Sequence, residues 1–218
     1  MRTAAILLLI FACGALSGCG GAAGTQESAA ASKALNVPPV EELMQPGPLG
    51  ERVLGNPNAP VTVIEYVSLT CPHCAAFQRD VFPRVKRDYI DTGKIRLIVR
   101  EFPIGRSAGN AAIANRCAPE DKYFTLLNAF LARQPEWVSQ EVRLDAIYGV
   151  AKSVGMSRET FDKCLANQSM IDGLNEGKQR GRKFGVIGTP TFFANGRKAQ
   201  GATTFEEFKA LIGPQSSS

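Results

Sequence analysis

Histidine is scarce in this chain of 218 residues, which contains only His73. A structural zinc ion needs four protein ligands and a catalytic one needs three plus water, and histidine and cysteine are usual ligands. His73 lies between Cys71 and Cys74 in the stretch CPHC, and the other cysteines are distant in sequence. We therefore expect no metal site. Copper(I), which accepts thiolates at low coordination number, is the metal alternative at these three residues.

A long apolar run is also lacking. The apolar stretch within MRTAAILLLIFACGALSGCG (1–20) follows one early charge, Arg2, and is too short for an ordinary membrane-spanning helix. Small residues follow it, which is the layout of a secretory signal. Its end, LSGC, resembles the lipobox of bacterial lipoproteins, which are cleaved before the cysteine and lipidated on it. We expect a signal peptide at 1–18 and a lipid on Cys19; a plain signal peptide cut elsewhere is the alternative.

The charge is not strongly of one sign. The formal net charge is +5, and removing Arg2 with the signal peptide would lower it by one. Such a modest excess, without a nucleic-acid-binding motif and in an exported chain, predicts no nucleic-acid partner.

Six cysteines are present. Cys13 would leave with the signal peptide and Cys19 would carry lipid, so Cys71, Cys74, Cys117 and Cys164 remain. An even set in an oxidising compartment is typical of disulfide pairs, and two disulfides are the economical outcome.

The sequence pattern predicts an α/β domain, the body of the protein, that is interrupted by a helical insertion. Residues 19–50, rich in Ala, Gly, Ser and Pro, are expected to be the lipidated cysteine and a flexible tether. Strand patterns at 61–69 and 94–102 flank a helix in which Pro83 should cause a kink or a break. A helical stretch follows at 105–183, with Ser157 as an N-cap. The body, 51–104 and 184–214, ends in a hairpin and a helix.

Short sequence patterns in the last third of the chain indicate a turn, a helix cap and a glycine repeat. Asn195-Gly196 predicts a two-residue hairpin turn, and Thr204 with Glu207 predicts a capping box. Glycines recur every four residues from 173 to 185. They form either a bare helical stripe that a neighbour approaches closely or a partly unwound segment, and the sequence does not decide between them.

The pair Cys71 and Cys74 is best explained by reactivity. A disulfide between residues three apart closes a very short loop and stabilises little. Cys71 comes where a strand ends and a helix begins, so free backbone N–H groups face its sulfur and favour the thiolate. Pro72 suits the first helical turn, and His73 can add positive charge or a hydrogen bond. Cys71 is then the attacked sulfur and Cys74 the buried resolving one.

VTVIEYVSLTCPHCAAF, a helical insertion and VIGTPTFFANG together resemble the DsbA family of exported thiol–disulfide oxidoreductases. The resemblance covers roughly 50–213 and implies a thioredoxin-like fold, a central mixed sheet flanked by helices, with an inserted all-helical domain. It implies a cis Pro190 beside the CPHC pair, with the backbone of Thr189 pairing with substrate. It also implies that Glu65 is a buried proton shuttle to Cys74; a strand residue paired with Lys94 or Arg96 is the alternative.

Cys117 and Cys164 resemble the second disulfide of a subset of this family, which would stabilise the insertion by roughly 4 kcal/mol on the loop-entropy argument. A second redox pair or buried free thiols are the alternatives.

The resemblance implies a periplasmic dithiol oxidase that works on reduced exported polypeptides with no cofactor other than its own cysteine pair. A membrane reoxidant of the DsbB type is the expected partner, and we expect a monomer. The alternatives are a disulfide isomerase or reductase, and a copper-binding lipoprotein.

Overall fold

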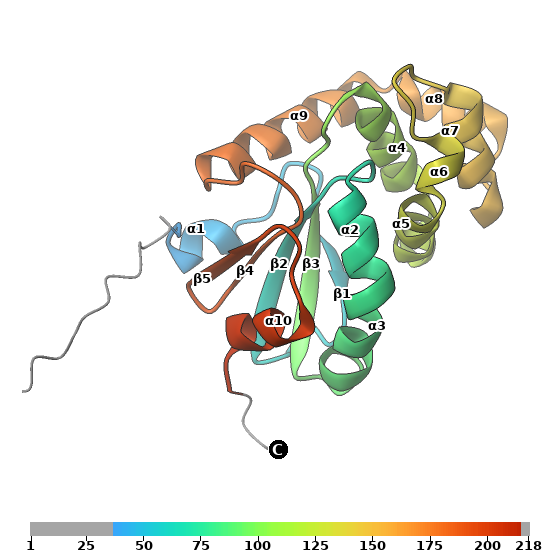
Figure 1. The fold of residues 1–218 in the computed structure, drawn as a ribbon. Coiled ribbons are helices and arrows are strands. Elements are labelled where there is room, and N and C mark those ends of the chain that lie inside the picture. Colours follow the sequence, from blue (N-terminus) through green and yellow to red (C-terminus); the bar gives the residue numbers. More distant parts are fainter. Residues whose placement is uncertain (1–36, 215–218) are drawn as a thin grey trace, which may run out of the picture. The chain divides into compact units, whose positions relative to one another are not determined.

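A five-stranded mixed sheet forms the centre of the structure, a computed structural model that describes residues 37–214 (Figure 1). The strand order is β1-β3-β2-β4-β5, and only β2 and β3 pair in parallel, with Val61 opposite Ile95. The strands are β1 (Arg52–Leu54), β2 (Val61–Val67), β3 (Ile95–Glu101), β4 (Thr191–Ala194) and β5 (Arg197–Gln200). This is the predicted thioredoxin-like architecture, and the short edge strand β1 was not predicted.

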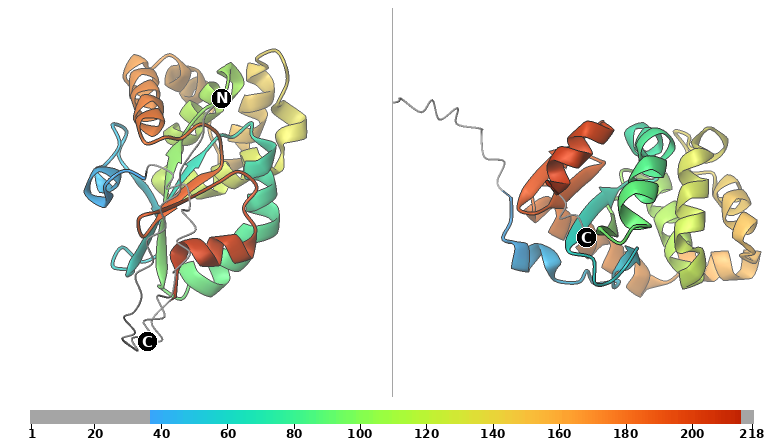
Figure 2. Two further views of the ribbon diagram at one scale, coloured as in Figure 1. Left: turned by 60° about the vertical axis from the view of Figure 1, so that its left-hand side comes forward. Right: turned by 90° about the horizontal axis from the view of Figure 1, so that it is seen from below.

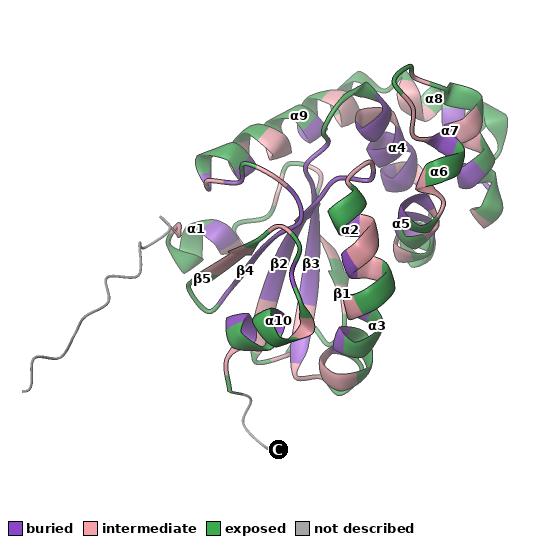
Figure 3. Cartoon of the chain, in the orientation of Figure 1, coloured by how far each residue is buried: buried purple, intermediate pink, exposed green. Residues whose placement is uncertain are grey.

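Helices cover both faces of this sheet (Figures 1 and 2). On one face lie α2 (Pro72–Ala76), α3 (Phe82–Val85) and α10 (Phe205–Ile212), and Phe77 packs on Phe192 of β4 with ring centroids 4.7 Å apart. The other face buries Tyr66 and Phe193 beneath α1 (Val40–Met44) and the end of α9 (Gln168–Lys183). Because β2 and β3 are covered on both sides, they are buried almost throughout (Figure 3).

The helical run after the cysteine pair continues through Pro83. π-Helical turns at Phe77–Val81 and Lys86–Ile90 flank α3, and Pro83 lies in the first turn of α3. The N–H of Phe82 reaches back five residues to the carbonyl of Phe77. Since proline has no N–H to donate, a regular α-helix cannot pass through it undisturbed. The interruption predicted here therefore takes the form of a widened turn.

The predicted insertion is helical. After α4 (Arg106–Cys117) come α5 (Tyr123–Ala132), α6 (Gln134–Trp137), α7 (Leu144–Ala151), α8 (Arg158–Leu165) and α9, with 3-10 turns at Glu120–Lys122 and Lys152–Val154. Ser157 caps α8 as predicted, because its side chain accepts the N–H of Thr160. None of the helices within 37–214 is both long and apolar enough to cross a membrane.

The hairpin and the last helix have the predicted geometry. Asn195 and Gly196 have φ values of 50° and 68°, as a type I′ turn requires. Thr204 and Glu207 form the reciprocal capping box of α10.

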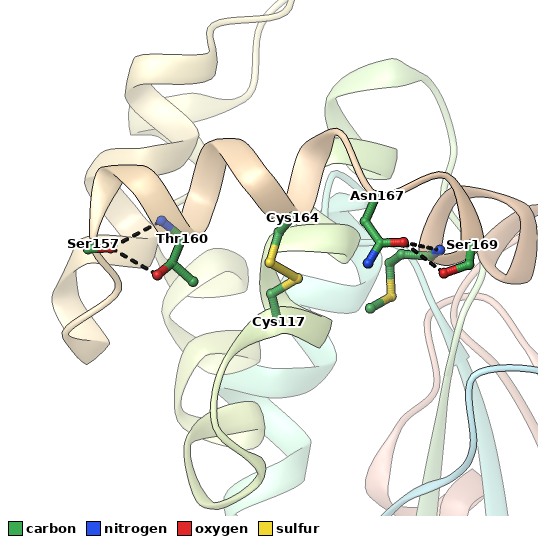
Figure 4. The surroundings of a disulfide bond; sticks show 7 residues. Cys117, Ser157, Thr160, Cys164, Asn167 and Ser169 are labelled. Atoms are coloured by element: carbon green, nitrogen blue, oxygen red, sulfur yellow. Dashed lines mark hydrogen bonds between the residues drawn. A yellow bond between two sulfur atoms is a disulfide. The ribbon is translucent and has the colours of Figure 1, made fainter.

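A disulfide joins α4 to α8 (Figure 4). Cys117 and Cys164 have Cα atoms 6.3 Å apart and lie 47 residues apart in sequence. The bond therefore links two helices of the insertion, as the resemblance implied.

The predicted tether is wrong for its last part, residues 37–50. Leu43 of α1 is only 4% exposed and packs with Tyr66 and Phe102 against the sheet. We call residues 42–50 the N-terminal strap. Its Ala-, Gly- and Pro-rich surroundings suggested a linker, but the strap is fixed by distant residues that composition does not show. The expected signal peptide and lipidated Cys19 lie outside the described residues.

Three arginines hold the carbonyl groups of this strap. Arg100 donates to the carbonyls of Leu43 and Gln45, at 2.9 Å each. Arg180 donates to the carbonyls of Glu42, Gln45 and Pro46. Arg116 donates to the carbonyls of Leu49 and Gly50.

The glycines of α9 accommodate the strap and the sheet. A Cβ on Gly173 would lie 2.4 Å from Leu49 Cδ2, and one on Gly181 would lie 2.9 Å from the Tyr66 ring. Gly177, near Pro48 at 4.0 Å, has more room. The helical alternative is therefore correct for these three glycines, whereas Gly185 follows the helix with a φ of 73°.

Candidate active site

The turn between β2 and α2 places Cys71 just beyond the carboxyl end of the central strand β2. Cys71 is the N-cap of α2, with extended backbone angles, and its N–H donates to the Ser68 carbonyl at 3.0 Å. Pro72 follows in the first helical turn, where its missing N–H costs no hydrogen bond. One helical turn later, Cys74 points into the core and is 1% exposed. The two sulfurs are free thiols in this structure.

Hydrogen bonds favour the thiolate of Cys71. They lower the pKa of Cys71 to about 5, with the Cys74 thiol as the largest cause, although partial burial acts in the opposite direction. The backbone N–H groups of His73 and Cys74 also donate to this sulfur. In the protonated form, the Cys71 thiol donates to the Thr189 carbonyl, with Sγ 3.1 Å from the oxygen.

Burial has the opposite effect on Cys74. Desolvation raises the pKa of Cys74 well above its ordinary value, and its hydrogen bond to Cys71 and the charges of Cys71 and Glu65 raise it further. Near neutral pH the pair is therefore a thiolate at Cys71 and a thiol at Cys74. This assigns the more reactive sulfur to the more accessible position.

The structure shows a contribution of the His73 backbone to the site. The His73 side chain is exposed, and it is the main-chain amide of this residue that reaches Cys71 Sγ. A thiolate at this position is thus stabilised by the local helical geometry, which Pro72 and the helix start provide.

Thr189 and Pro190 lie directly beside the cysteine pair. Their peptide bond is cis, as the resemblance implied. Thr189 is 6% exposed, and its carbonyl faces Cys71 Sγ. The segment that leads into β4 therefore forms one wall of the site.

Glu65 lies on β2 beneath the pair and is 4% exposed. Burial raises the pKa of Glu65 to about 8, so the neutral acid predominates at neutral pH. The side chain borders a cavity of about 210 Å³ that Gln78, Lys86 and Asn128 also line. Arg96, one of the bases considered as its partner, instead donates to Thr62 Oγ1 and the Pro57 carbonyl.

One residue at the site was not predicted from the sequence. The side-chain amide of Gln134, the first residue of α6, donates to the carbonyls of Leu69 and Cys71. No local pattern marks a glutamine 63 residues away from Cys71 as a neighbour, because the topology of the insertion brings it there.

The described part of the chain contains no cluster of three or more histidine, cysteine, aspartate or glutamate side chains suited to a metal ion. Cys71, Cys74 and His73 offer two thiolates and one imidazole, which are the ligands of the copper(I) alternative.

Comparison with known proteins identifies the family and the fold. A sequence model of the thioredoxin family matches residues 49–213. A Rickettsia conorii protein whose name places it among the protein-disulfide oxidoreductases is 38% identical over 148 residues, 67% of this chain and 53% of that protein. The chain thus spans about half the length of this relative. Disulfide bond formation protein D of Bacillus subtilis is 27% identical over 77% of this chain and 78% of its own length.

A solved structure of a DsbA protein has a similar fold. The crystal structure of α-DsbA1 from Wolbachia pipientis superposes with a TM-score of 0.72 at 31% identity and covers 78% of this chain and 92% of that one. The arrangement of Cys71, Cys74 and a cis Pro190 thus occurs on a fold shared with these proteins. The chain therefore belongs to the thioredoxin family and, within it, to the DsbA-like proteins.

Proposed function

We propose that this protein is an exported dithiol oxidase that introduces disulfides into other polypeptides through Cys71 and Cys74. The observation that carries the proposal is the contrast between the two sulfurs. Hydrogen bonds lower the pKa of Cys71 to about 5, whereas burial raises the pKa of Cys74. A stabilised thiolate favours the reduced pair over the disulfide, so the disulfide form is a strong oxidant.

The reaction starts from the Cys71–Cys74 disulfide. A substrate thiolate attacks Cys71 Sγ, the substrate–Cys71 bond forms, and the electron pair of the broken S–S bond goes to Cys74. A second substrate thiolate then attacks the substrate sulfur of this mixed disulfide and Cys71 leaves as a thiolate. The substrate is oxidised by two electrons and the enzyme pair is reduced by two.

Glu65 supplies the proton that Cys74 needs. Cys74 is released as a buried thiolate, which its surroundings strongly disfavour. Glu65, neutral at neutral pH and close enough for its charge to affect Cys74, donates a proton and regains it through the adjacent cavity. Attack at Cys71 is thus favoured by its accessibility, and protonation by Glu65 offsets the poor leaving ability of the high-pKa Cys74. The low pKa of Cys71 favours its own release when the second substrate thiolate attacks.

The backbone beside the cis Pro190 orients the substrate. The Thr189 carbonyl faces Cys71 Sγ in the free protein. An extended substrate chain would align with this segment while Cys71 holds the mixed disulfide.

The signal-like N-terminus supports a location in the periplasm, with a lipid on Cys19. The substrates are then reduced exported polypeptides, the protein acts as a monomer, and a membrane protein of the DsbB type reoxidises it. The DsbA-like relatives support thiol-containing polypeptide substrates and a membrane reoxidant in general terms.

Stoichiometric oxidation of a peptide with two thiols tests the proposal. The full chain in its disulfide form, in detergent micelles, should form one peptide disulfide per Cys71–Cys74 pair reduced. Cys71→Ser should abolish the transfer. Transfer that persists in Cys71→Ser would contradict the assignment, and tight one-to-one copper(I) binding by the reduced protein without any transfer would favour the copper-binding alternative.

A further inference from the structure

A side chain from the helical insertion holds the turn that carries Cys71. Gln134 Nε2 donates to the Leu69 carbonyl at 2.7 Å and to the Cys71 carbonyl at 3.0 Å. Both carbonyls belong to the short connection between β2 and α2, whereas Gln134 begins α6. The two bonds therefore tie the insertion to the backbone of the attacked cysteine itself.

The contact is specific for an amide. Two carbonyl oxygens face the end of the Gln134 side chain, so only its NH₂ group, with two hydrogens to donate, satisfies both. A methionine has nearly the same size and shape but no donor. A glutamate has the same shape but would direct a negative charge at two acceptors.

The carbonyl that Gln134 holds is part of the geometry that stabilises the thiolate. The Cys71 carbonyl also accepts the N–H of Ala75 at 3.1 Å, and the Cys71 N–H donates to Ser68. These bonds fix the peptide planes on both sides of Cys71. The next two peptide groups along the chain carry the N–H groups of His73 and Cys74, which donate to Cys71 Sγ.

We propose that Gln134 is a positioning residue through which the helical insertion holds Cys71 in the geometry that its thiolate requires. The proposal rests on the proposed redox function of Cys71. It assigns the insertion a part in setting the oxidising strength of the pair, in addition to any part in substrate contact. Gln134 acts through the backbone and does not touch the reacting sulfurs.

The test compares Gln134→Met and Gln134→Glu with the wild type, using the full chain in detergent micelles. Gln179→Met is the matched control, since Gln179 is exposed on α9 and, within residues 37–214, its side chain takes part only in a 3.4 Å contact with Arg182. Two properties of the reduced protein are measured: the pH dependence of iodoacetamide alkylation at Cys71, located by peptide mass spectrometry, and the equilibrium of the cysteine pair with glutathione.

In both Gln134 variants, the pH midpoint of alkylation should rise and the ratio of reduced to oxidised pair at fixed glutathione should fall. Each variant loses both hydrogen bonds, and the bond to the Cys71 carbonyl alone is expected to contribute a factor of roughly two to ten, with the larger effect for Gln134→Glu. Gln179→Met should behave like the wild type. A residue with only a structural role would lower the melting temperature and leave the midpoint and the equilibrium unchanged.

Unchanged midpoints and equilibria in folded Gln134 variants would overturn the proposal, as would an equal shift in Gln179→Met. If neither variant folds, as judged by circular dichroism, Gln134 determines the fold rather than the state of Cys71, and the proposal is also wrong. An ordinary alkylation midpoint in the wild type would instead contradict the proposed function itself, so the two failures are distinguishable.

Discussion

At the scale of residues, two chemically identical thiols lie in unequal environments. Cys71 is half-buried and receives hydrogen bonds, whereas Cys74 is enclosed by apolar side chains. The two cysteines are close in sequence, but one lies at the start of a helical run and the other one turn inside it. This difference gives the pair a direction of reaction.

The depressed pKa of Cys71 predicts how the stability of the reduced protein depends on pH. A thiol whose pKa falls on folding, here from 9.0 to about 5, contributes stability above its unfolded value and loses it as pH falls through the folded value. The free energy of unfolding of the dithiol form, relative to the disulfide form, should therefore rise from about pH 5 to about pH 9. Urea denaturation of both forms across this range measures it. A Cys71→Ala variant, which cannot form the disulfide, should lack the rise when it is compared with the same wild-type disulfide form, and an equal rise there would contradict the prediction.

The raised pKa of Glu65 predicts the opposite pH dependence, because its contribution to the free energy of unfolding falls as pH rises. Its pKa is raised on folding from 4.5 to about 8, so the folded protein holds this proton more tightly. The stability that the neutral acid contributes is complete below about pH 4.5 and is lost as pH rises towards 8. Glu65→Gln removes this loss, and by pH 8 the variant should be more stable than the wild type by a few kcal/mol, at ~1.4 kcal/mol per pH unit. Denaturation at about pH 5 and about pH 8 measures the difference, and parallel behaviour of the two proteins would show that Glu65 is not buried as described.

At the scale of elements, the glycines of α9 have different roles despite their regular spacing. Gly173 has Leu49 within 2.4 Å of the place of a Cβ, whereas Gly177 has nothing nearer than 4.0 Å. Gly173→Ala should therefore destabilise by about 1–3 kcal/mol through overpacking. Gly177→Ala, the matched control, should stabilise by up to ~1 kcal/mol through helix propensity. Thermal or urea denaturation compares them. Gly173→Ala should regain stability in a Leu49→Ala background, and a loss that persists there would show that the strap is not the cause.

The disulfide between α4 and α8 should stabilise the insertion. Replacing both Cys117 and Cys164 by alanine opens a loop of 47 residues and should lower the free energy of unfolding by roughly 4 kcal/mol. Urea denaturation of the double variant checks this value. A change below about 1 kcal/mol would contradict the loop-entropy account.

Sequence alone could predict the elements that depend on neighbouring residues. Pro72 after Cys71, Asn195-Gly196 and Thr204 with Glu207 act over a few residues, and each has its predicted geometry. The strap and the Gln134 contact depend instead on residues far apart in sequence. Composition therefore suggested a tether at 37–50, where Arg100 and Arg180 in fact hold the backbone.

At the scale of the whole molecule, the N-terminal strap joins the two halves of the fold. Arg116 of α4 forms a buried ion pair with Glu101 of β3 at 2.6 Å while it donates to the Leu49 and Gly50 carbonyls. Arg100 forms a second pair with Glu51 at 2.8 Å. Sheet, insertion and strap therefore meet in one network of charges.

This network predicts that the strap stabilises the fold. A chain that starts at residue 37 keeps the contacts of the strap and is the reference for urea denaturation. A chain that starts at residue 51 leaves Arg100, Arg116 and Arg180 without their carbonyl partners and should lose several kcal/mol, or fail to fold. Equal stability of the two truncated chains would contradict a structural role for the strap.

The redox equilibrium of the Cys71–Cys74 pair with glutathione tests the central claim most directly. A stabilised Cys71 thiolate predicts a potential well above the ~−270 mV of thioredoxin, towards the ~−120 mV typical of a strong dithiol oxidant. A value near that of thioredoxin would contradict the oxidase assignment. It would point to a reductase or an isomerase that needs an electron donor.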